Sequence, residues 1–120
     1  MPSLVLTTNV KIDDVKPFIQ KLSKYASEVL GKPEEYMCCT YNYNEHMLWH
    51  GTFDPALELT IISLGNISPQ SNIEYTKKLF EFFEAEIGVP KNRGYIFFSD
   101  PGRENVGSLR TSFGILASVN

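Results

Sequence analysis

The sequence predicts an α+β fold in which two β-α-β repeats form a four-stranded mixed sheet with two helices on one face. Two observations support this prediction. Short apolar runs typical of strands alternate with segments whose apolar residues recur at helical spacing. In addition, the motif Leu30-Gly31-Lys32-Pro33, which ends a helix, recurs in similar form as Ile87-Gly88-Val89-Pro90.

Length and composition limit the class of protein. The 120 residues suffice for one domain, so we expect a single domain over residues 1–120, with pseudo-repeats at about 2–50 and 57–99 and a C-terminal tail over 100–120. A net charge of −3 and a pI near 5.3 argue against a nucleic-acid-binding protein, which would carry a basic surface. No apolar run approaches the roughly 20 residues of a membrane span, and the start lacks the features of a signal peptide. We therefore expect a cytoplasmic protein without membrane insertion.

The first repeat begins with a short buried strand over Leu4–Thr8, an apolar run rich in branched residues. Asp13 or Asp14 offers an N-cap for the following helix, and Gly31 ends it. The helix carries one apolar stripe, formed by Val15, Phe18, Ile19, Leu22, Ala26, Val29 and Leu30. A second strand is predicted over Tyr36–Tyr43.

The second repeat begins with a third strand over Leu57–Leu64, which is apolar on both faces toward its end. Ser71-Asn72-Ile73-Glu74 has the spacing of a capping box, so we expect the second helix to run from there to about Ile87. Its apolar face would be formed by Ile73, Thr76, Leu79, Phe80, Phe83 and Ile87. A fourth strand is predicted over Tyr95–Ser99.

The repeat also predicts the sheet. The displacement that relates the two helix ends places Leu4 on Ile61, inside the third strand. Each crossover through a helix favours parallel pairing within its own half. With both helices on one face, the other face of a mostly apolar sheet has no cover in this chain, so we expect an oligomer.

The start of the chain, Met1-Pro2-Ser3, contains a candidate catalytic base. Initiator methionine is normally removed before a residue as small as proline, which would leave Pro2 with a free secondary amine. The ordinary pKa of an α-amino group is about 7.7–8.0, and burial beside apolar residues lowers it. A base with a pKa near neutrality is what proton abstraction requires. Alternatively, Met1-Pro2 is an ordinary frayed chain end.

The chain resembles the macrophage migration inhibitory factor and D-dopachrome tautomerase family, within the tautomerase superfamily that uses an N-terminal proline. The resemblance covers nearly the whole chain. It rests on an ordered set of motifs: Met1-Pro2, Thr8-Asn9, Leu30-Gly31-Lys32-Pro33, Asp54-Pro55, Ser63-Leu64-Gly65, Tyr95-Ile96 and Asn105-Val106-Gly107.

The resemblance implies a homotrimer with active sites between subunits and with Pro2 as the catalytic base. Lys32 would hold an anionic group of the substrate, and the backbone around Ser63 and Leu64 would line the pocket. Other pocket residues implied by position are Tyr95 and Phe97 from the neighbouring subunit, and Tyr36, Val106 and Phe113 at an apolar rim. The implied activity is keto–enol tautomerism of phenylpyruvate-like or dopachrome-like substrates, without a cofactor or a metal. Such a reaction needs one base near neutrality and a cation that stabilises enolate charge, which Pro2 and Lys32 would supply.

The sequence also departs from the migration inhibitory factor branch. Phe97 replaces an asparagine and Ser108 replaces a tryptophan, so the pocket is expected to be more apolar and its rim more open. The Cys-x-x-Cys of the family is absent, because the matching positions are Ala56 and Leu59. These changes leave the base and the cation in place and bear on the identity of the substrate.

The remaining candidate residues carry weaker signals. Cys38 and Cys39 are adjacent and would point to opposite faces of a strand, which disfavours a disulfide and indicates a reducing compartment. His46 and His50 have a metal-ligand spacing only on a helix, and here they flank a loop or edge segment at Met47-Leu48-Trp49, so surface histidines are expected.

Two other functions remain open at this level. One is a cytokine-like signalling protein, exported without a signal peptide, that binds a cell-surface receptor and has vestigial or secondary tautomerase activity. The other is a ligand-binding module without catalysis. The same surface around Pro2 would serve catalysis and signalling, so the sequence leaves these alternatives unseparated.

Overall fold

The fold is built on a four-stranded sheet with two helices packed on one face, and a short two-stranded sheet follows it in the chain. The computed structural model describes residues 1–108 together with the backbone of 111–112. In chain order the elements are β1 (Ser3–Thr8), α1 (Val15–Leu30), η1 (Glu34–Tyr36), β2 (Cys38–Tyr43), β3 (Leu57–Ile62), α2 (Pro69–Ile87), β4 (Gly94–Ser99), η2 (Arg103–Asn105), β5 (Gly107–Ser108) and β6 (Thr111–Ser112). Phe113 and the tail over 114–120, both named above, lie outside the described residues.

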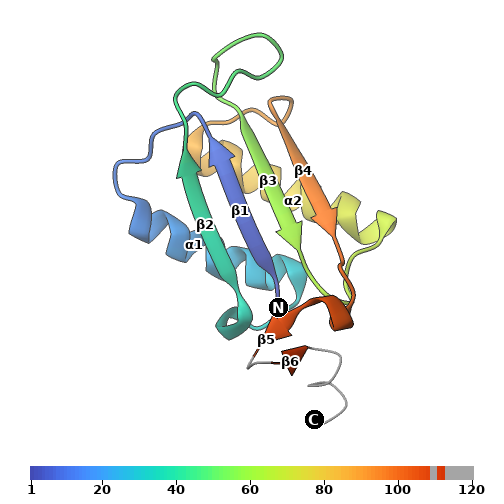
Figure 1. Cartoon of the computed structure of the whole chain (residues 1–120). Helices are drawn as coiled ribbons and strands as arrows, with labels where there is room; N and C mark the ends of the chain where they lie inside the picture. Colours follow the sequence, from blue (N-terminus) through green and yellow to red (C-terminus); the bar gives the residue numbers. More distant parts are fainter. Residues whose placement is uncertain (109–110, 113–120) are drawn as a thin grey trace.

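The strand order β2-β1-β3-β4 confirms the predicted pair of β-α-β repeats. β1 pairs with β2 in parallel and β3 pairs with β4 in parallel, while β1 and β3 meet antiparallel at the centre. Leu4 and Ile61, the two residues that the repeat superimposes, are direct partners across that central pair. Both helices lie behind the same face of the sheet (Figure 1). The sheet is therefore mixed, with a pseudo-twofold relation between its halves.

The core lies between this face and the helices. Alternate residues of β1 and β3 point into it and are fully buried, as expected for strands covered on one side. The apolar stripe of α1 buries Phe18, Leu22, Ala26 and Leu30, and α2 buries Leu79, Phe80, Phe82 and Phe83. Ile73 on α2 is 67% accessible, so its assignment to the apolar face was wrong. Ile73 lies in the second turn of the helix, before the stripe that contacts the sheet begins.

The open face of the sheet is less apolar than expected. On β1 and β3 it carries the half-buried side chains of Ser3, Val5, Thr7, Glu58, Thr60 and Ile62. Its large apolar residues come from β4, where Tyr95 and Phe97 are exposed. The apolar run at the end of β3 suggested a more hydrophobic open face. Ile61 and Ile62 are adjacent in this run and point to opposite sides of the strand, so only Ile62 lies on the open face.

The helix ends explain where the elements differ from the predicted bounds. α1 stops at Gly31, which adopts the left-handed conformation with φ of 67°, as predicted. α2 begins earlier than predicted, because Ser68 is its N-cap and accepts a hydrogen bond from Ser71 N at 3.1 Å. The predicted capping box at Ser71 is therefore wrong, and Pro69 occupies the first turn of the helix, where proline is well tolerated.

Two predicted strand segments are replaced by tighter structure. β2 begins at Cys38, and Tyr36 lies in the preceding η1 helix. The candidate edge segment at residues 47–49 contains an isolated bridge between Trp49 and Thr52, so it closes a turn around Gly51. No helix in the described part of the chain is long and apolar enough to cross a membrane.

Candidate active site

Pro2 lies at the start of β1 and is held within the sheet. Its side chain is fully buried, in phase with the inward-facing Leu4 and Leu6. Its carbonyl oxygen accepts a hydrogen bond from Cys38 N, the first residue of β2, at 3.0 Å. Pro2 is therefore an ordered residue at one end of the sheet and not part of a frayed chain end, which is compatible with a role for its nitrogen.

Lys32 reaches the same end of the sheet from the end of α1. The left-handed turn at Gly31 redirects the chain, and Lys32 N donates to the carbonyl oxygen of Ser27 at 3.1 Å. The Lys32 ammonium is half-buried and donates to the carbonyl oxygen of Leu64 at 2.9 Å. Because this carbonyl follows the end of β3, the cation is fixed beside the strand that neighbours Pro2.

Ser63 and Leu64 directly follow β3 at this end of the sheet, and both are buried. Ser63 N donates to the carbonyl oxygen of Ser99 at 3.0 Å, which continues the β3–β4 pairing. The Ser63 hydroxyl bonds the side-chain oxygen of Asn66, whose amide donates to the carbonyl oxygen of Leu30 at 3.1 Å. These contacts connect β3, β4 and the end of α1 into one rigid support.

Asp100 and Arg103 belong to the same region and were missed by the sequence analysis. The Asp100 carboxylate accepts hydrogen bonds from Gly65 N at 2.9 Å and from Gly102 N at 3.0 Å. These two backbone hydrogen bonds lower the pKa of Asp100. The turn sequence Asp100-Pro101-Gly102 was the available signal, since aspartate and glycine are typical of such turns. The turn places Arg103 near the start of the chain.

The charges at this end of the sheet favour the neutral form of the chain-terminal amine. In the structure, partial burial lowers the pKa of the Met1 α-amino group, and the charges of Lys32 and Arg103 lower it further. Both effects disfavour the protonated form. An amine at this position is therefore a better base near neutral pH than an ordinary chain terminus.

The predicted site residues fall into two groups in a single chain. Tyr36, which is 60% accessible, lies close to the Pro2–Cys38 contact, and Val106 follows η2 on the Pro2 side. Tyr95 and Phe97 lie on the open face of β4 instead. Tyr95 pairs with Glu58, four residues along β3 from the partner of Ser3, which corresponds to about 13 Å along the strand.

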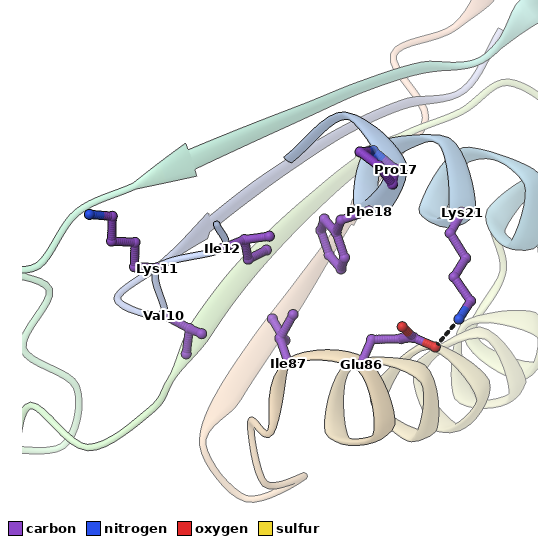
Figure 2. A pocket seen from close by; sticks show the side chains of 8 residues that line it. All are labelled: Val10, Lys11, Ile12, Pro17, Phe18, Lys21, Glu86 and Ile87. Atoms are coloured by element: carbon purple, nitrogen blue, oxygen red, sulfur yellow. Dashed lines mark ion pairs between the residues drawn. The ribbon is translucent and has the colours of Figure 1, made fainter. Parts of the chain in front are cut away.

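One cavity lies away from this end of the sheet. It has a volume of about 390 Å³ and is lined by Val10, Lys11, Ile12, Pro17, Phe18, Lys21, Glu86 and Ile87. Figure 2 shows apolar side chains pointing into it beside the Lys21–Glu86 ion pair of 2.6 Å, while Lys11 points away. A groove beside α2, of about 560 Å³, is lined partly by Phe80 and Gly94. Neither includes a predicted site residue.

The cysteines and histidines do not form a metal site in the part of the chain that the structure describes. Residues 1–108 and 111–112 contain no group of three possible metal ligands. Cys38 is exposed and Cys39 is partly buried, and burial raises the pKa of the Cys39 thiol to about 11, which makes it unreactive. His46 and His50 are both exposed, as predicted, and His50 also contacts the hydroxyl of Tyr95.

Comparisons with known proteins agree with the fold and with the resemblance. A family model described as "Macrophage migration inhibitory factor (MIF)" matches residues 1–114. A macrophage migration inhibitory factor homolog of Trichinella spiralis is 34% identical over 94% of this chain and 100% of its own length. A homolog of Brugia malayi is 30% identical over 95% of this chain and 100% of its own.

Solved structures give the same result. The macrophage migration inhibitory factor of Trichinella spiralis aligns with a TM-score of 0.86 at 33% identity, covering 92% of this chain and 99% of that one. The homologue of Prochlorococcus marinus aligns with a TM-score of 0.86 at 26% identity, covering 93% and 99%. The chain belongs to the macrophage migration inhibitory factor family.

Proposed function

We propose that the protein is a keto–enol tautomerase that uses the amine of Pro2, exposed by removal of Met1, as its catalytic base. The observation that carries this proposal is the environment of the chain start. Burial, Lys32 and Arg103 lower the pKa of the Met1 amine, and Pro2, one residue further in, is more deeply buried. The same causes would keep a Pro2 amine neutral near pH 7.

The reaction assigns a role to each group. The lone pair of the Pro2 nitrogen takes a proton from the carbon next to the substrate carbonyl, and the electrons of that C–H bond form the enolate. The proton held by the Pro2 nitrogen is then delivered to the enolate oxygen, directly or through a water molecule, which completes the transfer from carbon to oxygen and regenerates the neutral amine. The Lys32 ammonium binds the substrate carboxylate and stabilises the negative charge that develops. Because one proton leaves and one returns, no redox partner is needed.

We also propose a homotrimeric assembly in which the active site lies between subunits. Tyr95 lies about 13 Å and Phe97 about 7 Å along the strand direction from the Pro2 end of the sheet, on a strand that does not pair with β1. Their side chains would therefore serve the site of a neighbouring subunit. The open face that carries them has no cover among the described residues of one chain. A solution mass of three times the chain mass of 13.6 kDa, measured by light scattering, would support this assembly.

The substrate class follows from the charges and the apolar rim. A half-buried cation beside exposed aromatic residues suits a small aromatic keto acid such as phenylpyruvate. Phe97 makes the pocket more apolar than an asparagine would, and Ser108 leaves part of the rim open. Both favour an aromatic ring over a polar substituent.

The test is a tautomerase assay on untagged protein, with phenylpyruvate and a dopachrome ester as substrates. An intact mass measured on the same sample reports whether Met1 has been removed. We expect turnover only in the fraction that starts at Pro2, because a Met1–Pro2 peptide bond leaves the proline nitrogen without a basic lone pair. Equal turnover with Met1 retained would overturn the role of Pro2.

A second candidate function rests on the names of the relatives, which are called migration inhibitory factors. In that role the protein would act on a cell-surface receptor through the surface around Pro2. Binding to cells by a catalytically inactive Pro2→Gly variant would separate the two roles. Undiminished binding by this variant would favour a signalling role that does not need catalysis. An absence of cell binding by the native protein would assign the surface to the substrate alone.

A further inference from the structure

The end of the sheet opposite Pro2 is closed by the loop of residues 44–56, which connects β2 to β3 (Figure 1). Two side chains hold this loop. Arg93 donates hydrogen bonds to the carbonyl oxygens of Trp49 at 2.9 Å, Asp54 at 2.8 Å and Pro55 at 3.2 Å. Asn9 donates to the carbonyl oxygens of Met47, Phe53 and Asp54, and accepts from Ala56 N at 2.9 Å. The loop is therefore fixed at several points along its backbone.

Within this loop, His50 and Gly51 form a tight turn. Both have positive φ, 48° for His50 and 78° for Gly51, and Trp49 and Thr52 exchange two backbone hydrogen bonds of 2.9 and 3.2 Å. This is the pattern of a type I′ hairpin turn. His50 is the one non-glycine residue with positive φ among the described residues, a conformation that requires support from its surroundings.

The support comes from aromatic packing. The imidazole of His50 stacks on the indole of Trp49, with ring centroids 3.6 Å apart and planes 19° apart. Trp49 is itself only 6% accessible, and the guanidinium of Arg93 lies 5.1 Å from its ring centre. The orientation of the His50 ring is thus set by a buried tryptophan on a fixed loop.

This ring contacts Tyr95. His50 Nε2 lies 2.8 Å from the Tyr95 hydroxyl oxygen, and the Tyr95 ring packs against both Trp49 and His50. Tyr95 remains 49% accessible on the open face of β4, beside Phe97. The hydroxyl of a tyrosine can both donate and accept a hydrogen bond, and a partner on one side determines what it can do on the other.

We infer that His50 is a positioning residue that fixes the direction of the Tyr95 hydroxyl for substrate binding. This inference rests on the proposed function, in which Tyr95 contributes to the site of a neighbouring subunit. The oxygen atoms of a keto acid accept hydrogen bonds. When Nε2–H of His50 donates to the Tyr95 oxygen, the Tyr95 hydrogen is left to be donated to the substrate. His50 thereby selects for a carboxylate or carbonyl oxygen at that position.

A double-mutant cycle tests this role. His50→Gly removes the imidazole but suits the positive φ of the turn, because glycine adopts that conformation without strain. Tyr95→Phe removes the hydroxyl alone. We expect His50→Gly to lower kcat/KM for phenylpyruvate by about fivefold, mainly through KM, in the native background. In the Tyr95→Phe background the same change should alter kcat/KM by less than about twofold, because the group it positions is absent.

Equal losses in both backgrounds would overturn the inference, since His50 would then act through the loop and not through the hydroxyl. A native protein that lacks Met1 and shows no turnover would instead overturn the proposed function, so the two failures differ in the native arm. The ring-nitrogen chemical shifts of His50 give a readout independent of turnover. We expect Nε2 to carry the proton in the native protein and its chemical shift to change in Tyr95→Phe, where the hydrogen bond is lost. A native Nε2 that carries no proton, or an unchanged Nε2 shift, would overturn the inference.

Discussion

The two ends of the sheet are related by the internal repeat but are closed in different ways. Both helices end at a glycine with left-handed backbone, Gly31 with φ of 67° and Gly88 with φ of 71°. The next residue is Lys32 in the first repeat and Val89 in the second. The half-buried ammonium of Lys32 lies at the end of the sheet where Pro2 is, whereas Val89 is fully buried in the core.

The segment that precedes each central strand accounts for the difference. β1 is preceded by Met1 and Pro2, so this end can present an amine beside a cation. β3 is preceded by the loop of residues 44–56, and the buried Thr8 hydroxyl donates to the carbonyl oxygen of Ala56 at 2.7 Å. One end of the sheet thus carries the proposed base beside a cation, and we call it the reactive end after this proposed role. A loop fills the opposite end, which we call the sealed end.

The largest effect is expected at the reactive end. Pro2→Gly should lower kcat/KM for phenylpyruvate by about 100-fold, because a positioned general base contributes roughly 100-fold or more. The measurement is steady-state kinetics on untagged variant protein whose intact mass shows that Met1 has been removed. Thermal unfolding of the same sample serves as the control, because Pro2 is buried and its loss could also destabilise the fold. An active, folded variant with more than half of the native rate would contradict the role of Pro2.

At the sealed end the expected effect is on stability. Arg93→Ala should lower the free energy of unfolding by about 2 kcal/mol, since several carbonyl groups lose a charged donor. Arg93→Lys should recover only part of this, because an ammonium lacks the planar fork of donors. The check is urea unfolding at one fixed protein concentration.

Arg103→Gln is the matched control at the reactive end, because Arg103 is exposed. It should change the free energy of unfolding by less than about 0.5 kcal/mol. Equal destabilisation by Arg93→Ala and Arg103→Gln would remove the distinction between the two ends.

The pH dependence of activity tests the electrostatics of the reactive end. In the proposed mechanism the neutral amine is the base, so activity should fall as pH drops through the pKa of that amine. Burial lowers the pKa of the chain-terminal amine most, followed by Lys32 and then Arg103. Lys32→Met removes one positive charge and should raise the pKa of the Pro2 amine, which moves the acidic limb of the profile to higher pH. It should also lower kcat/KM about tenfold by removing the partner of the substrate carboxylate.

Arg103→Gln should shift the same limb in the same direction but by less, because Arg103 is the weaker cause. A shift to lower pH in either variant would show that these cations do not act on the base. The comparison of the two variants therefore separates the charge effect from the loss of substrate binding.

The smallest effect concerns the start of α2, close to the reactive end. Ser68→Ala should cost about 1 kcal/mol of stability, because Ser68 is the N-cap that accepts from Ser71 N. Ser71→Ala should leave the stability unchanged or raise it by a few tenths of a kcal/mol, since the Ser71 side chain does not cap the helix and alanine is the better helix former. Thermal unfolding of both variants checks this prediction. A larger loss of stability in Ser71→Ala than in Ser68→Ala would instead support a capping box at Ser71.

Local patterns predicted most of the fold. The glycine stops after Leu30 and Ile87, the alternation of β1 and β3, and the repeat that pairs Leu4 with Ile61 are properties of short segments. The start of α2 was misplaced because Ser71 and Ser68 both match a cap, and only the three-dimensional contacts distinguish them. The open face is less apolar than predicted, because only one of the two adjacent isoleucines of β3 points to it and most of its other side chains on β1 and β3 are polar.

The candidate site was predicted in part. Pro2 and Lys32 carry distinctive chemistry, and the structure brings Lys32 to Leu64, a contact between segments 32 residues apart. Asp100 and the His50–Tyr95 pair escaped notice because their contacts join segments 35 and 45 residues apart, and no local pattern marks such a pair. The relation of Tyr95 to Pro2 depends on a second subunit and stays a prediction.

The central claim is that the Pro2 amine is a base whose pKa is lowered by its surroundings. A ¹⁵N NMR titration of Pro2, in protein shown by mass to lack Met1, measures this pKa directly. We predict a midpoint below the ordinary range of an α-amino group, about 7.7–8.0, that coincides with the rise of kcat/KM with pH. A midpoint within or above that range, or a rise in activity at a different pH, would contradict the claim.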